Sequence, residues 1–108
     1  MKPDQSFLLL RARVREDQEN FSRWFRSQHL REVGKIPGIS SVEWGETPNG
    51  TQLGIYSFEN TQAMQGALES AEAAYSRGTW AQWAEQLEEF NVEMQLPLSP
   101  PTLSSSNN

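Results

Sequence analysis

Two residues in this sequence could carry acid–base chemistry together, His29 and Tyr56. His29 is the only histidine, and an imidazole with an ordinary pKa near 6.5 exchanges protons close to neutral pH. A histidine near the C-terminal end of a helix is also favoured by the helix dipole, so a boundary histidine without a chemical role is the alternative. A buried tyrosine needs a partner for its hydroxyl, and His29 is one candidate for Tyr56, water being the other. Gly54 leaves room beside Tyr56 because it has no side chain.

The rest of the composition excludes several other chemistries. The chain has no cysteine, so it has no thiol nucleophile, disulfide or thiolate metal site. Metal binding needs several convergent ligands, and one histidine does not supply them. A haem with His29 as its axial ligand has no second feature in its favour. We therefore predict neither a metal nor a cofactor.

Charge and hydropathy limit the partners and the location. The net charge is −5, and the arginines are interleaved with acidic residues, which argues against nucleic acid. No run of about 18 apolar residues predicts a membrane span. Without cysteine or a signal-peptide core, a cytoplasmic location is expected.

Hydrophobic periodicity predicts the order of the elements. Alternating residues predict strands at 7–15, 39–46, 51–59 and 90–96, with Asn49-Gly50 as the turn of a hairpin. A helix is expected over 18–33, capped by Asp17, with an aromatic stripe on one side. A second helix is expected over 60–78, with Tyr75 covering the core, and a short third one follows from Thr79. The stripe of the first helix comprises Phe21, Trp24, Phe25, Gln28 and Glu32.

This order predicts an α+β fold, a ferredoxin-like βαββαβ sandwich with a four-stranded antiparallel sheet and helices on one face. The domain should span residues 7–97, with a disordered tail at 98–108. The first and last strands each have an apolar face that is expected to lie under the helices. The opposite face mixes acids and arginines, which should pair across strands.

The first helix and its exit resemble the EthD-like proteins of the dimeric α+β barrel superfamily. The matching residues are Phe21, Trp24-Phe25, His29-Leu30 and Pro37-Gly38-Ile39. The resemblance implies a homodimer whose two sheets close into a barrel, with a pocket between helices and sheet in each subunit. It implies a small, often aromatic or polyketide ligand, commonly handled without a cofactor. Cyclase-type relatives often place several histidines and tyrosines in the pocket. This chain has one histidine and two tyrosines, which excludes a multi-histidine site.

The predicted site has His29 as the acid–base group and Tyr56 as a hydrogen-bond donor to the substrate. Trp24, Phe25 and Trp44 are its expected walls, with plain core packing as the alternative. The predicted function is binding of a small apolar or aromatic molecule, with cofactor-free proton transfer, cyclisation or oxygenation all open. The alternative is a ligand carrier, or a dimeric interaction or structural module, without catalysis. Whether the protein is an enzyme stays open at this stage.

Overall fold

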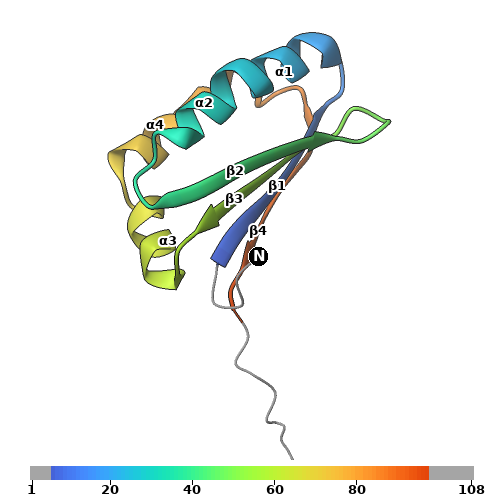
Figure 1. The fold of residues 1–108 in the computed structure, drawn as a ribbon. Helices are drawn as coiled ribbons and strands as arrows, with labels where there is room; N and C mark the ends of the chain where they lie inside the picture. The colour runs from blue at the N-terminus through green and yellow to red at the C-terminus, as the bar shows by residue number, and fades with distance from the viewer. Residues whose placement is uncertain (1–5, 98–108) are drawn as a thin grey trace, which may run out of the picture.

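Four strands form one antiparallel sheet in the order β2-β3-β1-β4. The structure is a computed structural model that describes residues 6–97. It confirms the predicted α+β sandwich (Figure 1). The predicted tail at 98–108 lies outside the described residues. The strands are β1 (Ser6–Val14), β2 (Ile39–Glu46), β3 (Gln52–Phe58) and β4 (Leu87–Gln95).

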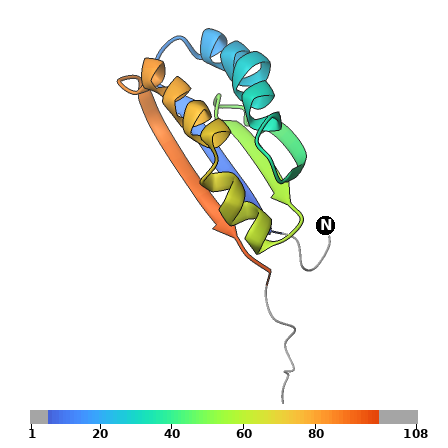
Figure 2. The ribbon, with the colours of Figure 1, turned by 90° about the vertical axis from the view of Figure 1, so that its left-hand side faces the viewer.

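The helices lie on one face of this sheet and form two neighbouring arms, one continuing from α1 into α2 and the other from α3 into α4 (Figure 2). The first arm contains a π-helical turn in its middle, and the second ends in a 3₁₀ turn. The elements of the first arm are α1 (Gln18–Trp24), η1 (Phe25–His29) and α2 (Leu30–Gly34); those of the second are α3 (Thr61–Leu68), α4 (Ala71–Gly78) and η2 (Thr79–Trp83).

The second arm corrects the prediction of one helix over residues 60–78. The helix breaks after Leu68 and restarts at Ala71 because the Ser70 hydroxyl accepts a hydrogen bond from the Ala73 amide and caps a new helix. The break turns Tyr75 outward, where 60% of its surface is exposed. Tyr75 therefore does not cover the core, as the sequence pattern had predicted.

Two predicted local features also differ in detail. Asp17 precedes α1 in a left-handed conformation. Its carboxylate accepts a hydrogen bond from the side-chain amide of Asn20 at 2.8 Å and does not cap the helix backbone. In the β2–β3 turn, Gly50 has positive φ but Asn49 does not. The turn is closed by Thr47, whose carbonyl accepts from the Gly50 amide.

The core lies between both helical arms and the inner strands β1 and β3. The aromatic rings of Phe21 and Phe25 are fully buried there, with Phe58 and Met64 beside them. The apolar side of β4 faces the second arm and meets it where Trp80 packs against Phe90, with ring centres 5.2 Å apart, but the close cover by helices that was expected is absent over most of its described residues. Phe90, Val92 and Met94 each keep about half of their surface exposed, between 46% and 52%.

Candidate functional site

His29 and Tyr56 meet across the interface between the first helical arm and the sheet. His29 Nε2 lies 2.6 Å from the Tyr56 hydroxyl oxygen. Both side chains are buried, with 2% and 5% of their surfaces exposed. The hydrogen bond joins residues that are 27 positions apart in the sequence. The sequence named His29 as a candidate partner for this hydroxyl, and the structure brings the two together.

The π-helical turn η1 explains why the imidazole is buried. In a regular α-helix, His29 would lie about 80° around the axis from Phe21, at the margin of the buried stripe. In η1 the Leu30 amide donates to the Phe25 carbonyl, five residues back. The wider turn gives each residue a smaller rotation, which brings His29 round to the buried side. Such turns often accompany functional sites.

Tyr56 reaches His29 because its side chain lies over Gly54. A Cβ atom at Gly54 would contact the Tyr56 hydroxyl and lie only 2.6 Å from the ring carbon Cζ. Any larger residue at Gly54 would therefore displace the phenol ring. This agrees with the sequence-based argument that Gly54 leaves room beside Tyr56.

Three aromatic rings hold the imidazole in place. Trp24 stacks against it with ring centres 5.7 Å apart, Phe25 lies at 4.8 Å, and Trp80 meets it edge-on at 4.9 Å. Trp24 and Phe25, predicted as ligand walls, pack behind His29 and do not line the pocket described below.

Trp44, the third predicted wall, lies away from this pair. It is 43% exposed, and its indole N–H donates to the Gln52 side chain at 3.1 Å. The Arg26 guanidinium lies over its ring, 5.3 Å from the centre. The structure thus places Trp44 in a surface cation–π contact, outside the site.

Burial keeps both partners of the hydrogen bond neutral at pH 7. Desolvation lowers the pKa of His29 to about 4 and raises the pKa of Tyr56 far above its ordinary value. The second ring nitrogen of His29, Nδ1, is buried and has no hydrogen-bond partner among residues 6–97. An orphaned N–H is rarer in protein interiors than an orphaned acceptor, which favours the proton on Nε2. His29 then donates to the Tyr56 oxygen, and the Tyr56 hydroxyl proton is free to point elsewhere.

A pocket with a volume of about 610 Å³ opens beside this pair, between the second helical arm and strands β1 and β4. Its deep end is formed by buried residues such as His29, Tyr56 and Val33, and its mouth by exposed ones such as Arg77 and Phe90. The lining is almost entirely apolar. It comprises Leu8, Leu10, His29, Val33, Ile36, Tyr56, Leu68, Ala73, Ser76, Arg77, Gly78, Trp80, Ala81, Ala84, Leu87, Phe90 and Val92.

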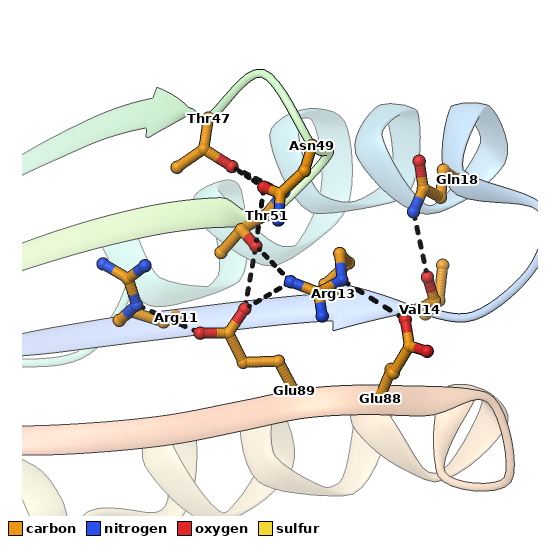
Figure 3. A network of polar contacts seen from close by, with 9 residues as sticks. All are labelled: Arg11, Arg13, Val14, Gln18, Thr47, Asn49, Thr51, Glu88 and Glu89. Atoms are coloured by element: carbon orange, nitrogen blue, oxygen red, sulfur yellow. Dashed lines mark hydrogen bonds and ion pairs between the residues drawn. The ribbon is translucent and has the colours of Figure 1, made fainter.

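The opposite face of the sheet carries a separate polar cluster (Figure 3). Glu89 pairs with Arg11 at 3.2 Å and with Arg13 at 2.9 Å, and it also accepts from the Thr51 hydroxyl. These hydrogen bonds, first that from Thr51, lower the pKa of Glu89. Arginines and acids thus pair across strands as expected, but the acids are Glu88 and Glu89, which were predicted to lie on a helix surface, because β4 begins at Leu87 and not at Phe90. Because the carboxylate and guanidinium groups of the cluster bind one another, we interpret the cluster as a structural feature of the sheet.

The described residues contain no group of three or more His, Cys, Asp or Glu side chains that could hold a metal ion. Over residues 6–97, no helix has the length and apolar character needed to cross a membrane.

Comparisons with known proteins identify the fold. No model of a protein family matches the sequence, and no curated protein sequence is significantly similar to it. Solved structures do match. An EthD family protein from Bacillus halodurans superposes with a TM-score of 0.67 and 16% identity, covering 82% of this chain and 96% of that one. The EthD-like resemblance seen around Trp24 and His29 is thus confirmed at the level of the fold.

Two further similar structures come from proteins named for oxygenation. SnoaB from Streptomyces nogalater, a cofactor-independent oxygenase, matches with a TM-score of 0.66 and 11% identity, over 90% of this chain and 96% of that one. A candidate antibiotic biosynthesis monooxygenase from Nitrosomonas europaea matches with a TM-score of 0.65 and 16% identity, over 93% and 96%. The chain therefore has the ferredoxin-like fold that these proteins share.

Sequence reasoning missed most of the pocket wall. Leu8, Leu10 and Val92 were recognised as one apolar face but were expected to lie under helices. Trp80, in the short helix expected from Thr79, lines the pocket and contacts His29. Arg77 lies near the end of the helix expected over 60–78 and was not predicted as a site residue. The available signal was the unbroken apolar side of residues 90–96.

Proposed function

We propose that this protein binds a small, largely apolar or aromatic molecule in the pocket beside His29 and Tyr56 and promotes a cofactor-free proton transfer on it. The observation that carries the proposal is the 2.6 Å contact between a neutral imidazole and a tyrosine hydroxyl that both line one apolar pocket. Apolar pockets with a few convergent polar groups and perturbed pKa values are typical of active sites. The fold is shared with SnoaB, which is described as a cofactor-independent oxygenase, and this supports chemistry without a cofactor.

In this proposal Tyr56 contacts the substrate and His29 acts through it. With the proton of His29 on Nε2, the Tyr56 hydroxyl donates to a ligand oxygen and stabilises the negative charge that forms when a neighbouring C–H or O–H ionises. The proton transfer itself uses the tautomer of His29 with its proton on Nδ1: the ligand gives a proton to the Tyr56 oxygen, the Tyr56 hydroxyl proton passes to His29 Nε2, and the products are the ligand anion, a neutral tyrosine and an imidazolium. The apolar wall keeps water from competing for these hydrogen bonds.

A test uses anthrone, an apolar aromatic ketone with an acidic C–H group. The exchange of that hydrogen for deuterium is followed by NMR with the wild type, with Tyr56→Phe and with Tyr75→Phe. We expect the wild type and the exposed-site control Tyr75→Phe to accelerate the exchange, and Tyr56→Phe to lose at least about tenfold, as is usual for a positioned acid–base group. Equal rates with and without protein would contradict catalysis.

The second candidate function is a ligand carrier without chemistry, and the depressed basicity of the imidazole favours it. A histidine whose pKa is about 4 is a weak base at pH 7. Under this alternative, anthrone binds to the wild type, as measured by quenching of tryptophan fluorescence, without any faster exchange. No binding at all would contradict both candidates and leave an interaction module. The expected homodimer, with two sheets closed into a barrel, belongs to the proposal in every case.

A further inference from the structure

The pocket carries one permanently charged side chain, Arg77, and it stands at the mouth. Every other lining residue is apolar or uncharged, and His29 is neutral because burial lowers its pKa. A charge on a ligand would therefore be disfavoured at the deep end, beside Val33 and Tyr56. At the mouth the same charge meets a guanidinium and water.

The Arg77 guanidinium has N–H donors that make no hydrogen bond within residues 6–97. Its Nη1 atom donates to the Leu68 carbonyl at 3.3 Å, and no carboxylate lies within ion-pairing distance of it among residues 6–97. A guanidinium has five N–H donors in a planar fork that fits a carboxylate. Arg77 thus differs from Arg11, Arg13 and Arg23, which are all paired with glutamates.

Element geometry directs Arg77 toward the pocket. It lies in the last turn of α4, and the same helix lines the pocket through Ala73 and Ser76. Residues 73, 76 and 77 share one side of a helix because they are three and four positions apart. The side of α4 that borders the apolar pocket therefore ends at Arg77, whose guanidinium donates to the carbonyl of Leu68, another lining residue.

We propose that Arg77 selects ligands that combine an apolar, ring-sized body with one carboxylate, the carboxylate lying at the mouth and the body reaching toward Tyr56. The inference rests on the proposed function and names its ligand class. It is not a consequence of overall charge, since a net charge of −5 repels anions from the molecule as a whole. Any preference for an anion must then arise locally.

The test compares two probes of nearly equal size, 2-naphthoate and the uncharged 2-naphthamide, by isothermal titration calorimetry at pH 7. We expect the wild type to bind 2-naphthoate about fivefold more tightly than 2-naphthamide, the ratio that a rim ion pair supports. Arg77→Gln should remove the preference and leave the affinity for 2-naphthamide unchanged. Arg77→Lys should keep part of the preference for 2-naphthoate. Raising the salt concentration should reduce the preference of the wild type.

Arg31→Gln is the matched control, because Arg31 is an exposed arginine on α2 that does not line the pocket. It removes the same charge and should retain the preference. Equal binding of both probes by the wild type, or an unchanged preference in Arg77→Gln, would overturn the role of Arg77 while leaving the proposed function intact. If neither probe binds, the proposed function is overturned, and the ligand class with it. Thermal melts of each variant verify folding, which exposed substitutions should leave unchanged.

Discussion

The Tyr56 hydroxyl lies 2.6 Å from His29 Nε2, in the only contact that joins the one histidine of the chain to a hydroxyl in the described residues. Three features produce this contact: the π-helical turn that ends at His29, the missing side chain at Gly54 and the aromatic rings around the imidazole. Changes to the Tyr56 hydroxyl, to His29 and to Gly54 each have a different expected result.

Removing the hydroxyl should destabilise the fold. In Tyr56→Phe, the buried Nε2 of His29 loses its partner, while Nδ1 already has none among residues 6–97. Leaving a buried polar atom unsatisfied costs about 1–3 kcal/mol, so the free energy of unfolding measured in urea should fall by that amount. Tyr75→Phe, at a 60% exposed position, should change it by less than about 0.5 kcal/mol. Equal stabilities of the two variants would mean that the hydrogen bond does not form.

Stability should depend on pH through His29. Its pKa is about 4 in the folded protein and 6.5 in the unfolded chain, so the unfolded state binds the proton more tightly. The contribution of His29 is complete above pH 6.5 and decreases as the pH falls toward 4, by about 3 kcal/mol in all. Glu89, whose pKa is lowered in the folded state, also loses stabilisation at low pH.

The variant His29→Gln separates these two groups. Glutamine cannot be protonated, so the difference in unfolding free energy between wild type and variant should shrink as the pH falls from 6.5 to 4. The titration of Glu89 is common to both proteins and cancels. A difference that stays constant across this range would show that the imidazole is not buried.

A methyl group at Gly54 should displace the Tyr56 ring from the site. In Gly54→Ala the new Cβ overlaps the Tyr56 ring, and relieving such a clash in a packed region costs about 1–3 kcal/mol. Gly45→Ala is the matched control in the neighbouring strand, because its Cβ would meet only a Leu53 methyl at 3.8 Å. We expect Gly54→Ala to lose both stability and 2-naphthamide binding, and Gly45→Ala to keep the binding. Full binding by Gly54→Ala would contradict the placement of Tyr56.

The molecular mass of the protein in solution tests the expected homodimer. Light scattering on the full chain should give twice the monomer mass of 12.3 kDa at micromolar concentration. The face that carries Leu9, Leu53 and Ile55, each only half-buried, would lie inside the closed barrel. A monomer over the whole concentration range would contradict the barrel and leave the pocket of the single subunit to be judged separately.

Much of the fold follows from the sequence because its periodicities are clear. The alternation in residues 7–15, the aromatic spacing from Phe21 to Phe25 and the Pro37-Gly38 turn each specify a local structure, and together they permit few topologies. The pairing of His29 with Tyr56 was also within reach, since a buried hydroxyl requires a partner and few were available.

Other features depend on tertiary arrangement and have no local signal. Nothing in Phe25–His29 distinguishes a π-helical turn from an α-helix, so His29 was placed at the margin of the stripe. Alternation showed that Val92 and Phe90 share a face, but it does not show whether a helix covers that face.

Trp44 illustrates a second limit of sequence patterns. It lies in one row across the sheet with Gly54, Leu10 and Val92, so its face was correctly identified. The strand order separates Trp44 from Val92 by three strand spacings, about 14 Å. Trp44 therefore lies at the edge opposite the pocket, a distance that no pattern within one strand can reveal.

The central claim is that the imidazole of His29 is neutral, buried and adjacent to a ligand pocket. Nitrogen-15 NMR of the side chain tests it directly, because the single histidine makes the ring signals unambiguous. We expect the two ring nitrogens to report a neutral imidazole protonated on Nε2 down to about pH 4 and to shift when 2-naphthamide is added. An imidazole with a pKa of 6.5, whose nitrogen signals do not shift when 2-naphthamide is added, would place His29 in water and contradict the proposed site.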